Sequence, residues 1–228
     1  MSKIKHFIIV SFIAFPCLAT TIYAQKVWEK KPYQQWSLSE VVQILSDSPW
    51  AQTQVKEEHD SFGTYLITIR LRSALVVRQA LVRQKQIHLN YDKFRPADKA
   101  RFDAEVKEFL ECPDCEKYYI ITIGSMNDLY PIRAIKESSL DKLRPYVFLT
   151  NDKGERRDLV HFIPPKNKQG EAMFVFSRFD DQGKPLLTVD NKTFHFKIDE
   201  KVFEGQTPPL KKFTFEVSKL LQRGDIVF

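Results

Sequence analysis

Glycine is scarce in this chain, and its scarcity excludes several kinds of functional site. Only 7 of the 228 residues are glycine. None of them forms a G-x-G-x-x-G fingerprint or a P-loop, the glycine-rich turns that cradle phosphate groups. A G-x-S-x-G nucleophile elbow and an H-E-x-x-H zinc motif are missing as well. We therefore assign no catalytic residue and no cofactor from sequence motifs.

Long apolar runs are also rare. The longest, Phe7 to Leu18, is shorter than the ~20 residues that a membrane-spanning helix needs. Lys3 and Lys5 precede it, and small or weakly polar residues lead from it to Ala24. This three-part layout is typical of a secretory signal peptide, so we expect residues 1–24 to direct export to the periplasm or the extracellular space.

Several fates of this segment stay open. Cleavage after Ala24 leaves Gln25 as the first residue, and cleavage after Ala19 is the alternative. Cys17 raises the question of a lipid anchor, but the residues before it lack the small side chains expected there. The segment could also be retained as an anchor, or form an amphipathic helix of a cytosolic protein, although it has no polar face.

The remaining chain has the composition of a folded protein. Hydrophobic residues make up 43% of the sequence, which includes 18 Phe, 8 Tyr and 3 Trp. This is enough to bury a sizeable core. Loss of Lys3 and Lys5 with the signal lowers the formal net charge from +6 to +4. So modest a charge, with no recognisable RNA- or DNA-binding motif, argues against a nucleic-acid partner.

Basic residues are concentrated between Arg70 and Arg101. The acids in that stretch are Asp92 and Asp98. Such a run is usually the solvated face of a helix. The alternative is a patch for an anionic partner, such as lipid headgroups, an acidic glycan or an acidic protein surface. The candidate residues for this contact are Arg78, Arg83 and Lys85.

The N-terminal half reads as mixed helix and strand. Ser37 and Glu40 have the spacing of a capping box, which opens a helix with Leu38, Val41, Val42 and Leu45 on one face. Alternation over 64–71 predicts a strand, and helical periodicity predicts helices over 74–91 and 96–111. Residues 118–123 are apolar on both faces, which favours a central strand covered on both sides.

After residue 145 the pattern changes to short strands separated by polar turns. Expected strands are 146–150, 157–163, 172–179, 193–198, 211–217 and 225–228. The predicted fold class is α+β, with a strand-and-helix half followed by a β-rich meander or small sandwich. The expected division is a signal peptide at 1–24, a mixed region at 25–145 and a β-rich region at 146–228, or one continuous domain over 36–228.

The only cysteines after the signal are Cys112 and Cys115. In thioredoxin-type enzymes a C-x-x-C motif opens a helix, which lowers the pKa of a thiol. Here a helix ends at the motif, and Glu111, Asp114 and Glu116 flank it, so a redox site is disfavoured. We expect a short-range disulfide, because an exported protein experiences oxidising conditions.

A metal site is not predicted. Zinc needs about four ligands, and the histidines that follow the signal, His59, His88, His161 and His195, show no paired spacing. The acids at 180–181 fit a hairpin turn better than a calcium loop.

Two segments carry a family resemblance. They are Trp36-Ser-Leu-Ser with Leu45-Ser-Asp-Ser-Pro-Trp50-Ala51, and 73–80 after the first long strand. Together they resemble uncharacterised exported bacterial proteins. The resemblance implies export and a shared fold, and it implies no activity.

We therefore expect a non-enzymatic binding or interaction module of the bacterial envelope. The alternative is an enzyme, either a thiol–disulfide redox protein at Cys112 and Cys115 or a hydrolase with an unrecognised site. A structural subunit of an envelope complex is a third hypothesis, which predicts an exposed apolar patch.

Overall fold

The computed structural model describes residues 26–57, 64–125, 134–166, 170–203, 212–222 and 225–226. The expected signal peptide, with Cys17, lies outside these residues, and so does His59. Within the described ranges, no helix combines the length and the apolar character that crossing a bilayer requires.

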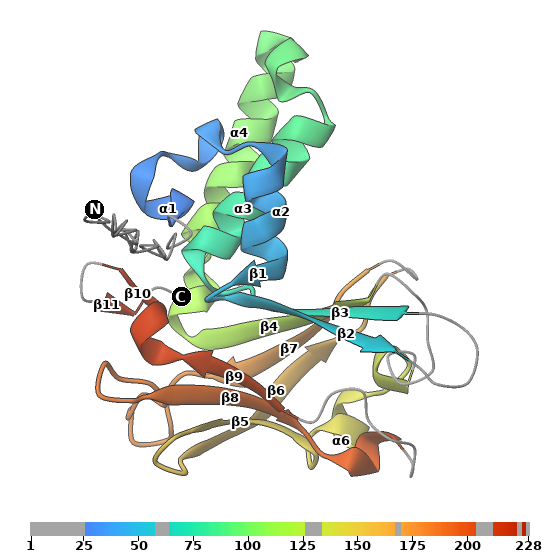
Figure 1. Ribbon diagram of the computed structural model, residues 1–228, viewed down its shortest axis with the longest axis vertical. Coiled ribbons are helices and arrows are strands. Elements are labelled where there is room, and N and C mark those ends of the chain that lie inside the picture. The colour runs from blue at the N-terminus through green and yellow to red at the C-terminus, as the bar shows by residue number, and fades with distance from the viewer. Residues whose placement is uncertain are drawn as a thin grey trace, which may run out of the picture.

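A curled antiparallel sheet of nine strands forms the body of the protein (Figure 1). Its strand order is β1-β2-β3-β4-β7-β6-β5-β8-β9. The strands are β1 (Asp47–Ser48), β2 (Ala51–Glu57), β3 (Thr64–Leu71), β4 (Tyr118–Ser125), β5 (Val147–Asn151), β6 (Arg156–Ile163), β7 (Ala172–Ser177), β8 (Thr193–Ile198) and β9 (Lys212–Glu216). A separate pair, β10 (Leu221–Gln222) and β11 (Asp225–Ile226), lies near the C-terminus.

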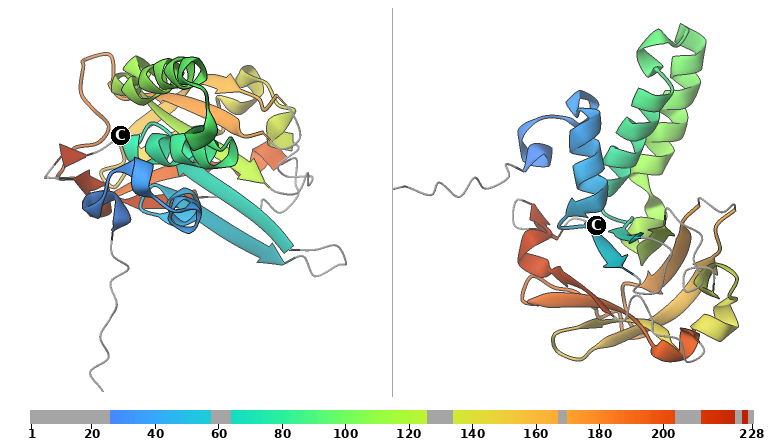
Figure 2. Two further views of the ribbon diagram at one scale, coloured as in Figure 1. Left: turned by 90° about the horizontal axis from the view of Figure 1, so that it is seen from above. Right: turned by 45° about the vertical axis from the view of Figure 1, so that its right-hand side comes forward.

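The longer helices gather on one side of this sheet. The α-helices are α1 (Val27–Lys30), α2 (Leu38–Ser46), α3 (Leu75–His88), α4 (Pro96–Glu111) and α6 (Leu140–Leu143). The 3-10 turns are η1 (Tyr33–Gln35), η2 (Tyr91–Lys93), η3 (Pro113–Glu116), η4 (Glu200–Phe203) and η5 (Val217–Lys219). The α+β class is confirmed, with strands predominating. Helices α3 and α4 form a hairpin, here called the helical arm (residues 75–111), that projects away from the sheet (Figures 1 and 2).

Helix α2 begins with the expected capping box but buries a different face. The Ser37 Oγ accepts from the Glu40 backbone N–H at 3.3 Å, and the Glu40 carboxylate accepts from the Ser37 N–H at 2.7 Å. Val41, Ile44 and Leu45 are buried, whereas Leu38 and Val42 are 44% and 49% exposed. The sequence pattern misplaced the apolar face by part of a turn, because α2 packs against both α3 and β2 rather than against one flat surface.

Strand β4 is central, as its two apolar faces predict. It pairs with β3 on one side and with β7 on the other. The pairing of Tyr119 with Phe176 and of Ile121 with Phe174 joins strands from before and after residue 145 in one sheet. Strand order departs from a simple meander, because β8 returns to pair with β5 rather than with β7.

Aromatic rings fill the interior of the curl. Tyr119 lies 5.5 Å from Phe194, and Phe194 lies 5.6 Å from Phe215, measured between ring centroids. Phe174 and Phe196 are 5.4 Å apart. Edge-to-face and tilted pairs at these distances add to the free energy gained by burying the rings. The sheet is curled far enough that a side chain of β2 reaches the backbone of β9.

Candidate functional site

The three residues predicted to meet an anionic partner have different surroundings. Arg78 is 5% exposed, and its guanidinium donates to the backbone carbonyls of Ser73 and Leu110. It also lies 3.1 Å from the Cys115 Sγ. Arg78 therefore does not belong to a surface patch: the helical pattern placed it away from the apolar stripe, but α4 and η3 cover that side of α3.

Arg83 and Lys85 are less deeply placed. The Arg83 Nε donates to the backbone carbonyl of Trp36 at 2.9 Å, which attaches α3 to the segment before α2. Lys85 is exposed, lies 3.8 Å from Glu105 on α4, and sits above the Phe102 ring. Of the three, Lys85 alone presents its charge to solvent.

Most of the exposed positive charge of the segment from Arg70 to Arg101 lies instead at the free end of the helical arm. We call residues 88–101 the arm tip. Its basic side chains are Lys93, Arg95, Lys99 and Arg101, and its acids are Asp92 and Asp98. Asp98 pairs with Arg95 at 2.7 Å and with Arg101 at 3.3 Å, yet the two arginine side chains stay 83% and 75% exposed. The tip is therefore an exposed, net basic surface.

Aromatic residues give this tip a defined shape. Tyr91, Phe94 and Phe102 form a cluster with centroid separations of 5.2 to 6.1 Å. The Tyr91 hydroxyl donates to the Asp103 carboxylate at 2.7 Å, which ties η2 to α4. Leu89, two residues before Tyr91 in the sequence, is 46% exposed. The arm tip thus contains an exposed apolar side chain as well as its basic side chains.

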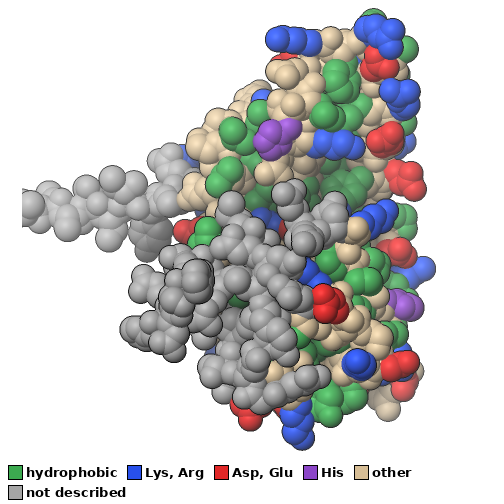
Figure 3. Space-filling model, turned by 90° about the vertical axis from the view of Figure 1, so that its right-hand side faces the viewer, with side chains coloured by type: hydrophobic (Ala, Val, Ile, Leu, Met, Phe, Trp, Pro, Cys, Tyr) green, Lys and Arg blue, Asp and Glu red, His purple; other side chains and the backbone are tan. Residues whose placement is uncertain are grey.

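The second half of α4 and the following η3 have the opposite charge. Residues 103–116 contain six acids and a single lysine, Lys107. Figure 3 shows Lys and Arg side chains at the upper end of the arm, with Asp and Glu side chains further down its edge. Helix α4 and η3 are therefore polarised, basic toward the tip and acidic toward the sheet, whereas α3 contributes three basic residues, Arg78, Arg83 and Lys85.

Two shallow grooves flank the arm. One, of about 640 Å³, lies between η1 and the α3–α4 pair and is lined by Tyr33, Gln86, Tyr91 and Asp103 among others. Burial and the Asp103 carboxylate raise the pKa of Tyr33. The other, of about 350 Å³, is largely apolar and has a rim of two cations and a carboxylate; it is lined by Arg72, Leu81, Val82, Lys85, Glu105, Val106 and Phe109.

The expected disulfide joins Cys112 and Cys115, whose Cα atoms lie 5.3 Å apart. Cys112 ends α4 in a left-handed conformation, with φ of 42°, and is half-buried. Cys115 is 4% exposed. The Arg178 guanidinium donates to the Cys115 carbonyl at 3.0 Å. The bridge thus closes the turn between α4 and β4 next to two arginines.

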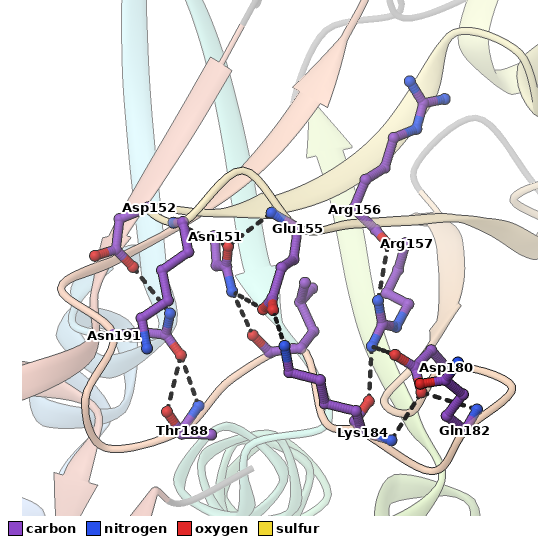
Figure 4. Close-up of polar contacts among 12 residues, drawn as sticks. Asn151, Asp152, Glu155, Arg156, Arg157, Asp180, Gln182, Lys184, Thr188 and Asn191 are labelled. Atoms are coloured by element: carbon purple, nitrogen blue, oxygen red, sulfur yellow. Dashed lines mark hydrogen bonds and ion pairs between the residues drawn. The ribbon is translucent and has the colours of Figure 1, made fainter.

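A polar network between the β5–β6 turn and the segment 178–192 has a structural role. Asn151 donates from its amide to the Leu186 carbonyl at 2.8 Å and accepts from the Lys153 and Glu155 N–H groups, both at 3.0 Å (Figure 4). Asn191 donates to Asp152 at 3.0 Å. These contacts attach the crossover segment 178–192 to the β5–β6 hairpin, and they use both the donor and the acceptor of the Asn151 amide.

The acidic pair at 180–181 lies beside the same network. Asp180 accepts from the backbone N–H groups of Gln182 and Lys184 at 3.0 and 2.8 Å, so the acidic pair at 180–181 belongs to a turn. Lys184 and Asn151 hold the pKa of the Glu155 carboxyl below its usual range. His195 lies on β8, and its ring contacts Thr193 and Thr214.

Metal-binding clusters of three or more His, Cys, Asp or Glu side chains do not occur among the described residues. Comparison with known proteins yields no matching family model, curated protein or solved structure. Function therefore has to be inferred from the geometry of the chain itself. The sequence identified the basic segment but did not show which of its residues are buried and which are exposed. The contacts that bury Arg78 and the hydrogen bond of Arg83 come from residues distant in the chain.

Proposed function

We propose that this protein is an exported binding module of the bacterial envelope whose arm tip docks on an anionic lipid surface. The observation that carries the proposal is the arm tip itself. Four basic residues and an exposed leucine lie within residues 88–101, at the end of a helical hairpin that stands clear of the sheet (Figure 2). Basic residues beside exposed apolar ones favour binding at the headgroup region of a membrane.

The charges at the tip can exchange partners at little cost. Arg95 and Arg101 share the single carboxylate of Asp98, and exposed ion pairs of this kind contribute at most about 1 kcal/mol. Each Lys or Arg near an anionic bilayer contributes roughly 1 kcal/mol. A phosphate-rich surface can therefore compete for these cations, and Leu89 can enter the interfacial layer at the same time.

Export and family membership belong to the same proposal. The layout of residues 1–24 supports export, and the segment from Trp36 to Ala51 supports kinship with the uncharacterised exported bacterial proteins. We also infer a division of labour within the chain. The half up to residue 145 contains all the helices longer than four residues among those described, and it supplies the contact surface. The β-rich part from residue 146 then acts as its scaffold.

Vesicle co-sedimentation tests the docking. The wild-type protein is mixed with phosphatidylcholine vesicles with and without phosphatidylglycerol. We expect binding only to the anionic vesicles, and we expect it to weaken with salt. The double substitution Lys93→Glu/Arg95→Glu should weaken binding at least about tenfold, since it removes two attractive charges and adds two repulsive ones.

The control variant is Lys153→Glu/Lys192→Glu, which changes net charge equally at exposed positions on the turns between sheet strands. It should bind the anionic vesicles nearly as well as wild type. Equal losses in the two variants would show that only net charge matters, and wild-type binding by the tip variant would show that the tip is not the contact. Either result overturns the proposal.

A further inference from the structure

We propose that Cys112 and Cys115 form a thiol–disulfide exchange site, which accepts two electrons from a dithiol on a reduced protein, and that Arg78 stabilises the Cys115 thiolate. This inference does not depend on membrane docking. It starts from the 3.1 Å contact between the Arg78 Nη1 and the Cys115 Sγ.

The surroundings of Arg78 leave its charge without a matching anion. Its guanidinium donates to two backbone carbonyls and to the sulfur, and among the described residues no carboxylate lies within ion-pair distance of it. Its Nε is buried without a hydrogen-bond partner. Burial, with Arg72 nearby, lowers the pKa of Arg78 to about 10, so the group remains a cation at neutral pH. A buried cation in this position gains free energy when the adjacent sulfur becomes a thiolate.

This contact opposes the electrostatic effects expected from the sequence. The end of α4 and the acids Glu111, Asp114 and Glu116 disfavour a thiolate, but all three carboxylates are exposed and therefore screened by water. Arg78 acts at hydrogen-bond distance in a buried environment, where electrostatic interactions are stronger. Because Arg78 is nearer to the sulfur and less screened than the carboxylates, it determines whether the Cys115 thiol ionises.

Burial also makes the two sulfurs unequal. Cys112 is half-buried, whereas Cys115 is 4% exposed. A thiolate of the partner dithiol attacks the Cys112 sulfur. The Cys112–Cys115 bond breaks, and its electron pair stays on Cys115 as a thiolate beside Arg78. A thiolate that is a better leaving group departs faster.

The second thiolate of the partner then attacks the partner's own sulfur in the mixed disulfide. This releases Cys112, which takes up a proton, and leaves the partner oxidised. Two electrons pass from the dithiol to the Cys112–Cys115 disulfide. Of the two protons that the dithiol loses, one goes to Cys112 and the other to solvent, because Cys115 remains a thiolate.

The equilibrium with glutathione tests this role. The protein is equilibrated in buffers of defined glutathione ratio, and its reduced fraction is measured by thiol trapping. Arg78→Gln should shift the equilibrium constant by roughly 10- to 100-fold in favour of the disulfide, because a hydrogen bond to a charged group contributes about 1.5–3 kcal/mol. Arg78→Lys should restore part of the shift.

Arg83→Gln is the matched control. Arg83 also lies on α3 and also donates to a backbone carbonyl, but its hydrogen bonds go to Trp36 and Gln86 rather than to a sulfur. Its substitution should leave the equilibrium constant unchanged. Equal constants for wild type, Arg78→Gln and Arg83→Gln would overturn the proposal.

A second measurement covers the case in which Arg78→Gln fails to fold. In the Cys112→Ser variant, which keeps Arg78, thiolate absorbance follows the ionisation of Cys115 directly. We expect a pKa below that of an ordinary thiol, about 8.5. An ordinary or raised pKa would show that Arg78 does not stabilise the thiolate, and this would also overturn the proposal.

Discussion

Single polar side chains attach distant segments of this protein to one another. Asn151 is 3% exposed and connects the β5–β6 hairpin to Leu186 in the crossover segment. Arg83 connects α3 to the segment before α2 in the same way, through the Trp36 carbonyl. Both contacts use a side chain to satisfy backbone groups, which are costly to bury without a partner.

Asn151→Ala should be strongly destabilising. It leaves the Leu186 carbonyl and the Lys153 and Glu155 N–H groups without the partners they have now. We expect a loss of about 2–3 kcal/mol in the free energy of unfolding, measured by urea denaturation. Lys153→Ala keeps the Asn151 contacts and should change stability by less than about 0.5 kcal/mol. A loss for Asn151→Ala as small as that of Lys153→Ala would refute this role for the asparagine.

At the scale of elements, local signals set most helix ends, although α3 ends at His88 and not at the predicted Tyr91. They set helix faces less well. The start of α4 at Pro96 and its end at Glu111 are as predicted. The start of α2 after Ser37 is also as predicted. Which side of α2 is buried was decided by packing against α3 and β2, and Leu38 and Val42 consequently face solvent.

Ser37→Ala tests the contribution of the α2 cap. The substitution removes the acceptor for the Glu40 N–H, and an N-cap serine is worth about 1 kcal/mol. We expect the unfolding midpoint in urea to fall accordingly. Gln43→Ala, at an exposed position of the same helix, should leave it unchanged or raise it slightly, because alanine favours helix. Similar midpoints for the two variants would show that the cap contributes nothing to stability.

At the scale of the whole molecule, the two ends of the sheet approach each other. The Gln52 side chain on β2 donates to the Thr214 carbonyl on β9 at 2.6 Å, across 162 positions of sequence. Backbone hydrogen bonds do not join β2 to β9. The sheet ends at β1 on one side and at β9 on the other, and β2 pairs with β1 and β3. The side chain thus bridges the open side of a curled sheet whose interior is filled with aromatic rings.

Gln52→Ala should loosen this closure without unfolding the core. We expect a stability loss of about 1 kcal/mol, from one net hydrogen bond, together with faster amide hydrogen exchange in β9. Gln54→Ala alters the same strand two residues further on and keeps the Gln52 bridge, so it should leave exchange in β9 unchanged. Unaltered β9 exchange in Gln52→Ala would mean that the bridge does not hold the edge.

The sequence by itself determined the α+β class, most element boundaries and the central place of β4, because periodicity, caps and turn residues act over a few neighbouring positions. Only the tertiary structure decided that β8 pairs with β5, that Arg78 lies against Cys115 rather than in solvent, and that the exposed basic surface of the arm lies at its tip. These outcomes depend on contacts between residues far apart in the chain. The free energy of burying a side chain is set by whatever covers it, and local sequence carries no record of that neighbour.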